Sequence, residues 1–121
     1  MANGSWINAE ILFEGTGTAT KPIVLKAQQK GKVIITGRSN LRIAGAYLWV
    51  EGLVFSNGYS PTADLIAFRK DAKTLANHCR LTACVVDNFN SPERNHVEAW
   101  VVLFGKNNRV DHCQFVDKRN Q

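Results

Sequence analysis

The sequence holds a set of histidines and cysteines, the side chains that zinc prefers in proteins. They stand as His78 beside Cys79, as Cys84, and as His112 beside Cys113. Neighbouring residues on a strand point to opposite sides, so an adjacent His and Cys cannot both reach one metal ion. The sequence also lacks a Cys-x-x-Cys pair. The spacing argues against zinc.

Nucleophilic catalysis by cysteine is the second chemistry to weigh, and it needs a thiol that is partly exposed and has a low pKa. Cys84 and Cys113 instead occupy the place that Leu53 takes in an internal repeat described below, which predicts that they are buried. Three cysteines do not make a closed disulfide framework, so we expect free thiols.

Paired carboxylates would indicate glycoside hydrolysis, but the acidic residues outside the polar stretch described next are single and far apart. They include Glu10, Glu14, Glu51, Asp64, Asp87 and Asp111. The one dense polar stretch, 90–98, is either a solvated turn or a wall of a substrate site. Aromatic residues among basic ones are suited either to stacking on sugars or bases or to packing within strands. These are Tyr47, Trp49, Tyr59 and Trp100.

The formal net charge of +5 predicts attraction to polyanions: nucleic acid, acidic lipid headgroups or acidic polysaccharide. The basic residues are scattered, and no run of five like charges marks a nucleic-acid-binding tail. Nucleic-acid binding therefore rests on net charge alone. The chain has no 18-residue apolar run for a membrane span and no secretory signal after Met1, so either the mature protein is cytosolic or its leader has been left out.

Short apolar runs with period-two alternation, separated by Gly, Asn, Ser and Pro, predict β-structure throughout. The expected strands are 23–27, 33–37, 41–43, 47–55, 65–68, 79–86, 100–104 and 109–116. Helix-forming residues gather only in 71–77, which is too short for a stable helix. We expect a loop with one turn there.

An internal repeat is the decisive feature of the sequence, because a fixed period indicates stacked structural units. The segments 48–57, 79–88 and 108–117 align with apolar residues at the third, sixth and eighth places. The spacing between successive copies is nearly constant and falls in the range of one solenoid repeat. Stacked coils would set the third and sixth places in two interior columns. The columns are Val50, Leu81 and Val110, and Leu53, Cys84 and Cys113.

The same alignment predicts the corners of the coils. Gly52 and Ala83 break the alternation at the fifth place, where the chain can bend, while His112 departs from this pattern. Asn57 and Asn88 fall at the tenth place and would stack as a ladder of amides, with Asp117 in the third copy. A β-sandwich is the rival fold, but it does not explain a repeat of this length with Asn at the same phase.

Many short motifs together resemble the early coils of the polysaccharide lyases that include alginate lyase and chondroitinase B. They lie in 8–15, 22–27, 33–37, 39–45, 50–53, 57–59, 88–94 and 105–112. The resemblance implies an all-β, single-stranded right-handed parallel β-helix, a pectin-lyase-like solenoid. It also implies that residues 1–121 are a partial, truncated domain formed by the N-terminal coils of a longer lyase domain.

The resemblance further implies β-elimination at a uronic acid, with calcium neutralising the carboxylate, a lysine removing the C5 hydrogen and an arginine assisting. No residue of this sequence lines up with the family's calcium ligands, catalytic lysine or catalytic arginine, so none is assigned. Lys118 and Asn120 match a Gly-Lys-x-Asn pattern of the family and are expected to line the polyanion groove, with a structural turn as the alternative. Asp117 stands where that pattern has glycine.

The sequence thus predicts a fragment of a lyase that cleaves an acidic polysaccharide, with alginate favoured over a glycosaminoglycan, and that is inactive alone. The alternative is a module that binds such a polysaccharide without cleaving it. We expect no nucleic-acid or membrane partner, and self-association through an open C-terminal coil. By family resemblance, the parent protein is expected to be secreted or periplasmic.

Overall fold

The computed structural model describes residues 1–61, 64–89 and 99–116, and all regular secondary structure in these residues is β-strand. The strands follow one another in successive coils. The first coil has β1 (Gly4–Ile7), β2 (Glu10–Thr16) and β3 (Ile23–Lys26); the second has β4 (Val33–Arg38), β5 (Asn40–Ala46) and β6 (Leu48–Glu51). The third has β7 (Leu53–Tyr59), β8 (Asp64–Ala67), β9 (Ala76–Asn77) and β10 (Arg80–Thr82). The fourth has β11 (Val85–Phe89), β12 (Ala99–Val102) and β13 (Arg109–Asp111), and β14 (Gln114–Val116) begins the next.

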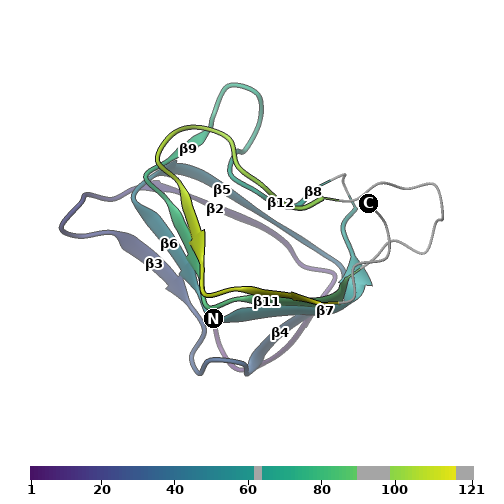
Figure 1. The fold of residues 1–121 in the computed structure, drawn as a ribbon. Helices are drawn as coiled ribbons and strands as arrows, with labels where there is room; N and C mark the ends of the chain where they lie inside the picture. The colour runs from purple at the N-terminus through teal and green to yellow at the C-terminus, as the bar shows by residue number, and fades with distance from the viewer. Residues whose placement is uncertain (62–63, 90–98, 117–121) are drawn as a thin grey trace.

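Stacking of the coils builds three parallel sheets, one on each side of a triangular cross-section (Figure 1). Sheet A has the order β1-β4-β7-β11-β14, sheet B has β12-β8-β5-β2 with β9 also paired to β5, and sheet C has β13-β10-β6-β3. Followed from the N-terminus, the chain runs anticlockwise in Figure 1 as it comes toward the viewer. The fold is therefore the predicted right-handed parallel β-helix.

Apolar side chains fill the space inside the three sheets in continuous columns. Val50 pairs with Leu81, and Leu81 pairs with Val110, as the repeat predicts. Val50 and Leu81 are fully buried, while Val110 in the last described coil is only partly buried. Full burial of one such side chain contributes roughly 1.5–3 kcal/mol, so each added coil stabilises the one beneath it.

Single residues with positive φ turn the chain between sheets. Gly52, Ala83 and His112 form one corner with φ of 80°, 54° and 52°, so His112 adopts the same backbone as the smaller residues at this place. Asn57 and Asn88 have φ of 54° and 51°, and the Asn88 amide donates a hydrogen bond of 3.1 Å to the Asn57 oxygen. The predicted asparagine ladder is thus confirmed for these two residues, while Asp117 lies outside the described residues.

The structure corrects the sequence-based prediction in three places. The segment 1–22 holds β1 and β2, where no strand was expected. The predicted strands 47–55, 79–86 and 109–116 are each divided by the corner at the fifth place. Val33 pairs with Leu53 of the next coil, so the second coil is shorter than the spacing of the sequence repeat. A coil without a long loop between its strands needs less chain to close one turn.

The predicted loop at 71–77 leads into β9 and is held by one carboxylate. Asp71 Oδ1 accepts hydrogen bonds from the amides of Lys73 and Thr74, at 2.8 and 2.9 Å. The Lys73 bond, followed by that from Thr74, lowers the pKa of the Asp71 carboxyl. This is an Asx turn, in which the aspartate side chain mimics a backbone turn.

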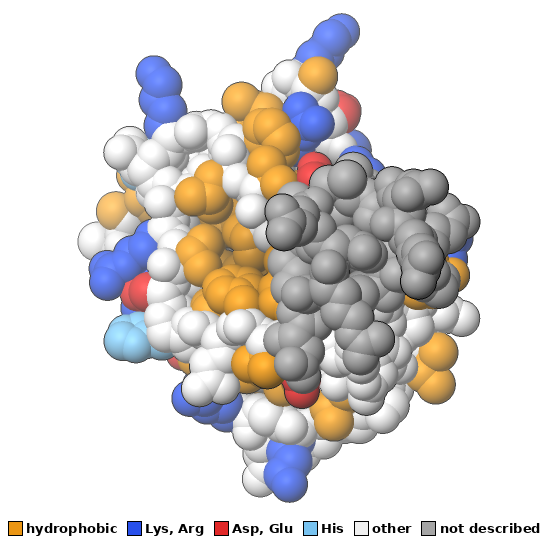
Figure 2. Space-filling model, turned by 45° about the vertical axis from the view of Figure 1, so that its right-hand side comes forward, with side chains coloured by type: hydrophobic (Ala, Val, Ile, Leu, Met, Phe, Trp, Pro, Cys, Tyr) orange, Lys and Arg blue, Asp and Glu red, His pale blue; other side chains and the backbone are white. Residues whose placement is uncertain are grey.

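The last coils leave apolar side chains open to solvent. Figure 2 shows them gathered in a hollow at this end of the solenoid. Val101, Val110 and Cys113 pack against the core but are only partly buried, and Phe115 is exposed. Self-association through this end stays a prediction. No helix among the described residues is long and apolar enough to cross a membrane.

Candidate functional site

The outer face of sheet C carries two ladders of side chains, because alternate residues of a strand point outward and the four strands are in register. Trp49, Arg80 and Arg109 are stacked in the first ladder. In the second ladder Lys26 and Glu51 are followed by Thr82 and Asp111. The first ladder, together with the neighbouring Tyr47 and His78, is called the basic–aromatic face below.

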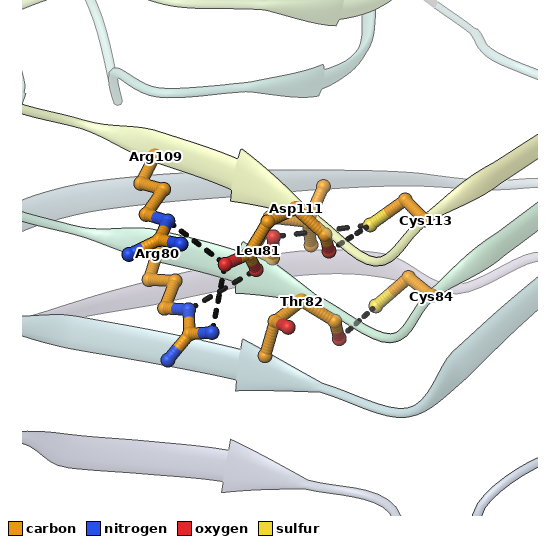
Figure 3. Close-up of polar contacts among 7 residues, drawn as sticks. All are labelled: Arg80, Leu81, Thr82, Cys84, Arg109, Asp111 and Cys113. Atoms are coloured by element: carbon orange, nitrogen blue, oxygen red, sulfur yellow. Dashed lines mark hydrogen bonds and ion pairs between the residues drawn. The ribbon is translucent and has the colours of Figure 1, made fainter.

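Arg80 joins the two ladders. Its guanidinium carbon lies 5.2 Å from the centre of the Trp49 ring, within the range of a cation–π contact. Its Nε and Nη2 atoms donate hydrogen bonds of 3.1 and 2.7 Å to the two oxygens of Asp111. Arg109 Nε lies 2.8 Å from Asp111 Oδ2 (Figure 3). One carboxylate therefore holds two guanidinium groups in fixed positions on the surface.

A second aromatic pair borders the arginines. The rings of Tyr47 and His78 are stacked with centroids 4.8 Å apart and an angle of 4° between their planes. Both residues have φ of 54°, which turns their side chains outward at the corner before sheet C. Together with Trp49, Arg80 and Arg109 they line a hollow of ≈ 270 Å³. The hollow thus has both ring faces and cationic groups on its walls.

A second hollow of ≈ 290 Å³ lies where the strands of sheet C end, whereas the first lies where they begin. Lys26, Lys30 and Glu51 line it, together with the corner residues Gly52 and Ala83. Lys26 Nζ lies 3.7 Å from Glu51 Oε2, but both side chains are largely exposed, so the pair contributes little to stability. Basic side chains therefore lie at both ends of the strands of sheet C: Arg80 and Arg109 beside the first hollow, and Lys26 and Lys30 beside the second.

This arrangement suits binding of an anionic sugar chain. An exposed aromatic ring packs against the apolar face of a sugar ring, and a guanidinium donates paired hydrogen bonds to a carboxylate. Trp49 is 37% exposed, so its ring is accessible beside Arg80. Among the described residues of this face, we find no nucleophile and base within hydrogen-bond reach of each other.

The structure separates the residues that the sequence singled out. The Cys79 and Cys84 side chains are buried, whereas the His78 ring lies outside on Tyr47, and the three cysteines are free thiols. Trp100 is buried and donates a hydrogen bond of 2.7 Å to the Phe89 carbonyl, so it is a packing residue. The stretch 90–98, Lys118 and Asn120 lie outside the described residues.

The described residues do not fit a calcium site. None of them form a group of three or more His, Cys, Asp or Glu side chains that could hold a metal ion. Asp111 is engaged by two arginines, and Glu14 Oε1 lies 3.5 Å from Lys70 Nζ. Calcium prefers six to eight oxygen ligands, and the described acidic side chains do not supply such a set.

We expect Asp111→Asn to make the stability of the protein less sensitive to acid. The hydrogen bond from Arg80 is the main cause that lowers the pKa of the Asp111 carboxyl to about 2, from an ordinary 3.8. A carboxyl with a lowered pKa adds stability above its ordinary pKa, and this is lost as the pH falls from 3.8 through 2. Urea midpoints measured by circular dichroism should therefore fall more steeply for the unchanged protein over this window. Parallel pH curves would contradict the prediction.

Comparison with known proteins places this fold among polysaccharide lyases. The family model for chondroitinase B matches residues 1–121. A search of curated protein sequences found no match. The solved structures matched include the family 6 alginate lyase AlyGC, at 51% identity and a TM-score of 0.97 over 99% of this chain and 16% of that one.

Two further family 6 lyases share the fold. A mannuronic acid-specific enzyme from the human gut microbiota is 40% identical, with a TM-score of 0.92 over 98% of this chain and 28% of that one. Pedsa3628 from Pseudopedobacter saltans is 32% identical, with a TM-score of 0.86 over 100% of this chain and 29% of that one. The chain therefore spans less than a third of the length of each of these lyases.

Proposed function

Because the chain belongs to the chondroitinase B family of polysaccharide lyases, we propose that its basic–aromatic face binds an acidic polysaccharide, alginate in the first place. AlyGC is an alginate lyase and the gut enzyme is specific for mannuronic acid, and both share this stretch of fold with the chain. Every sugar of alginate carries a carboxylate, so the polymer matches a surface of arginine and tryptophan.

The observation that carries the proposal is the ladder of Trp49, Arg80 and Arg109. The register of sheet C places one of these side chains on each successive coil, about 4.8 Å apart. Asp111 fixes the guanidinium groups before any ligand arrives, which lowers the entropy that binding must overcome. Arg80 and Arg109 together exceed the charge of Asp111, so the cluster keeps a net positive charge.

We further propose that this chain supplies scaffold and binding surface to a lyase and does not itself catalyse elimination. The chain covers 16–29% of the length of the lyases that it matches. The family resemblance assigns none of its residues as the catalytic lysine or arginine. Any calcium requirement would rest on residues outside those that the structure describes. Export of the parent protein remains a prediction from the family.

Titration calorimetry with short alginate oligosaccharides, in the presence of a chelator, tests the binding. We expect heat of binding at low salt that weakens at physiological salt, because exposed charges are screened over about 8 Å there. A neutral glucan of equal length should give no signal. Absence of alginate binding at low salt would sink the proposal, and stronger binding of a short DNA would favour nucleic acid instead.

Ultraviolet absorbance of the unsaturated uronate product tests the second part. With alginate and added calcium, we expect a flat trace from this chain and a rising trace from an active lyase of the same family used as a control. Binding with a flat trace supports a non-catalytic chain. A rise that depends on the concentration of this chain would show that catalytic groups lie within it.

A further inference from the structure

Cys84 and Cys113 lie directly above one another in an interior column of the solenoid. The pairing of Val85 with Gln114 sets the register, and the Gln114 amide donates a hydrogen bond of 3.0 Å to the Cys84 carbonyl. Neighbouring strands are about 4.8 Å apart, and a disulfide joins residues whose Cα atoms are roughly 4.4–6.8 Å apart. The Cα spacing expected between these two coils therefore falls within the range that a disulfide allows.

The two thiols also point the same way. Cys84 Sγ donates to the Thr82 carbonyl at 3.4 Å, and Cys113 Sγ donates to the equivalent Asp111 carbonyl at 3.2 Å. Cys113 Sγ is also 3.8 Å from the carbonyl oxygen of Leu81, an atom of the coil below. Figure 3 shows the side chains one above the other, with their sulfur atoms on the same side. The Cys113 sulfur thus leans toward the strand that precedes Cys84.

The two thiols differ in exposure and in pKa, and this difference indicates which of them reacts first with an oxidant. Cys84 is 1% exposed, whereas Cys113 in the last described coil is only partly buried. When Cys113 ionises, its sulfur can accept the hydrogen bond of the Cys84 thiol in place of the Thr82 carbonyl, which lowers the pKa of Cys113 to about 7. The same contact, and then burial, raise the pKa of Cys84. Cys113 is therefore the thiol that a dissolved oxidant meets first, and its lowered pKa favours the reactive thiolate form.

We propose that Cys84 and Cys113 form a disulfide that fastens the last described coil to the coil beneath it. The oxidant is a low-molecular-weight disulfide. The Cys113 thiolate attacks one of its sulfur atoms and releases one small thiolate, leaving a mixed disulfide on Cys113. The Cys84 sulfur then attacks Cys113 and releases the second small thiolate. The two protons of the protein thiols end on these products, and the oxidant takes up two electrons.

The disulfide would stabilise the last described coil, whose apolar side chains are less buried than those of the coils before it. Phe115 and Val116 in β14 are exposed, and Val110 is only partly buried beside them. A link between Cys84 and Cys113 closes a loop of the chain that contains β11, β12 and β13. Because such a link restricts the unfolded chain, the oxidised protein should melt at a higher temperature than the reduced protein.

Cys79 provides a matched control. It is as buried as Cys84, but its neighbours in the column are Leu48 and Asn108, so it has no thiol partner above or below. The Asn108 side chain accepts a hydrogen bond from the Cys79 amide at 2.9 Å. Cys79→Ser should therefore leave the proposed bond unaffected.

The test is to incubate the unchanged protein with oxidised glutathione, digest it with trypsin and map the peptides by mass spectrometry. Cleavage after Lys106 and Arg109 places the two cysteines on separate peptides. We expect one linked pair that has lost two hydrogen atoms, in the unchanged protein and in Cys79→Ser, and a higher melting temperature that dithiothreitol reverses. Cys84→Ser should instead retain glutathione on Cys113.

Three results would overturn the proposal. One is a glutathione adduct on Cys113 that persists in the unchanged protein while Cys84 remains free. Another is a link from Cys79 to either thiol, which would show that the columns rearrange. The third is a linked pair with an unchanged or lower melting temperature, which would mean that the bond distorts the coil. Because the first comparison uses only the unchanged protein, a variant that fails to fold does not obscure it.

Discussion

The variant Gly45→Ala should lose about 3 kcal/mol or more of stability, which is a large fraction of the total for a chain of this size. Gly45 lies in β5 with φ of 121°, a conformation that side chains rarely adopt. It pairs with Gly15 of the coil below and with Ala76 of the coil above. A Cβ atom at Gly45 would meet the carbonyl oxygen of Gly15, which is backbone and cannot swing away. Stacking of the first and second coils would therefore be disturbed.

The variant Gly4→Ala separates the cost of the unusual φ from the cost of the steric clash with the neighbouring coil. Gly4 has φ of 126°, close to the value at Gly45, but a Cβ atom there would meet nothing within 4 Å. Alanine at Gly4 should therefore show only the conformational cost, about 1–3 kcal/mol. Urea unfolding followed by circular dichroism measures both variants. Equal losses for the two would mean that the coils move apart to accept the methyl group, contrary to our expectation.

The interior of the solenoid could be predicted because it repeats. Buried positions such as Val50 and Leu81 recur at a nearly constant spacing, and period-two alternation then decides which neighbours face inward. The corner at Asn57 and Asn88 was predictable for the same reason, since asparagine is one of the few residues that readily adopts positive φ. At the asparagine corner, the backbone preference of the residue type and its position in the repeat both predict the same conformation.

The candidate site was harder to predict because its residues break local rules. Tyr47 has positive φ, which its residue type does not indicate, although His78 belongs to a type that adopts positive φ more often than most. The sequence alone also does not indicate the contact between Arg80 and Asp111. Asp111 lies in the next coil, two residues after Arg109, the residue that pairs with Arg80. The signal was present, however: Arg80 and Arg109 share one place of the repeat, and Asp111 lies two residues later on the same outward side.

The strands β1 and β2 show a different limit of sequence reasoning. Gly4–Ile7 is short, has exposed side chains at all four positions and begins with glycine, so it shows no alternation of buried and exposed residues that would indicate a strand. It becomes a strand because β4 offers it a paired edge, with Gly4 opposite Val33. Structure imposed by a neighbouring coil leaves little trace in the segment itself.

The variant Trp49→Ala should weaken alginate binding at least about fivefold, because stacking of a nucleic-acid base on an aromatic side chain contributes roughly 1–3 kcal/mol and we expect a similar contribution from a sugar ring. The expected effect is on affinity alone. Trp49 is partly exposed on the outside of sheet C, so its removal opens no cavity in the core. Arg80 keeps its two hydrogen bonds to Asp111 and hence its place on the face.

Trp6→Ala is the matched control for this prediction, since Trp6 is 39% exposed, close to the 37% of Trp49, but lies in β1 of sheet A. It should bind alginate as the unchanged protein does. Arg109→Ala should complete the separation: it removes a charge, so its affinity should fall at low salt and its dependence on salt should become shallower. Trp49→Ala should keep the original salt dependence, because a ring contact is not screened. If Trp6→Ala weakened binding as much as Trp49→Ala, the sugar chain would have to lie on sheet A, and the basic–aromatic face would not be the binding surface.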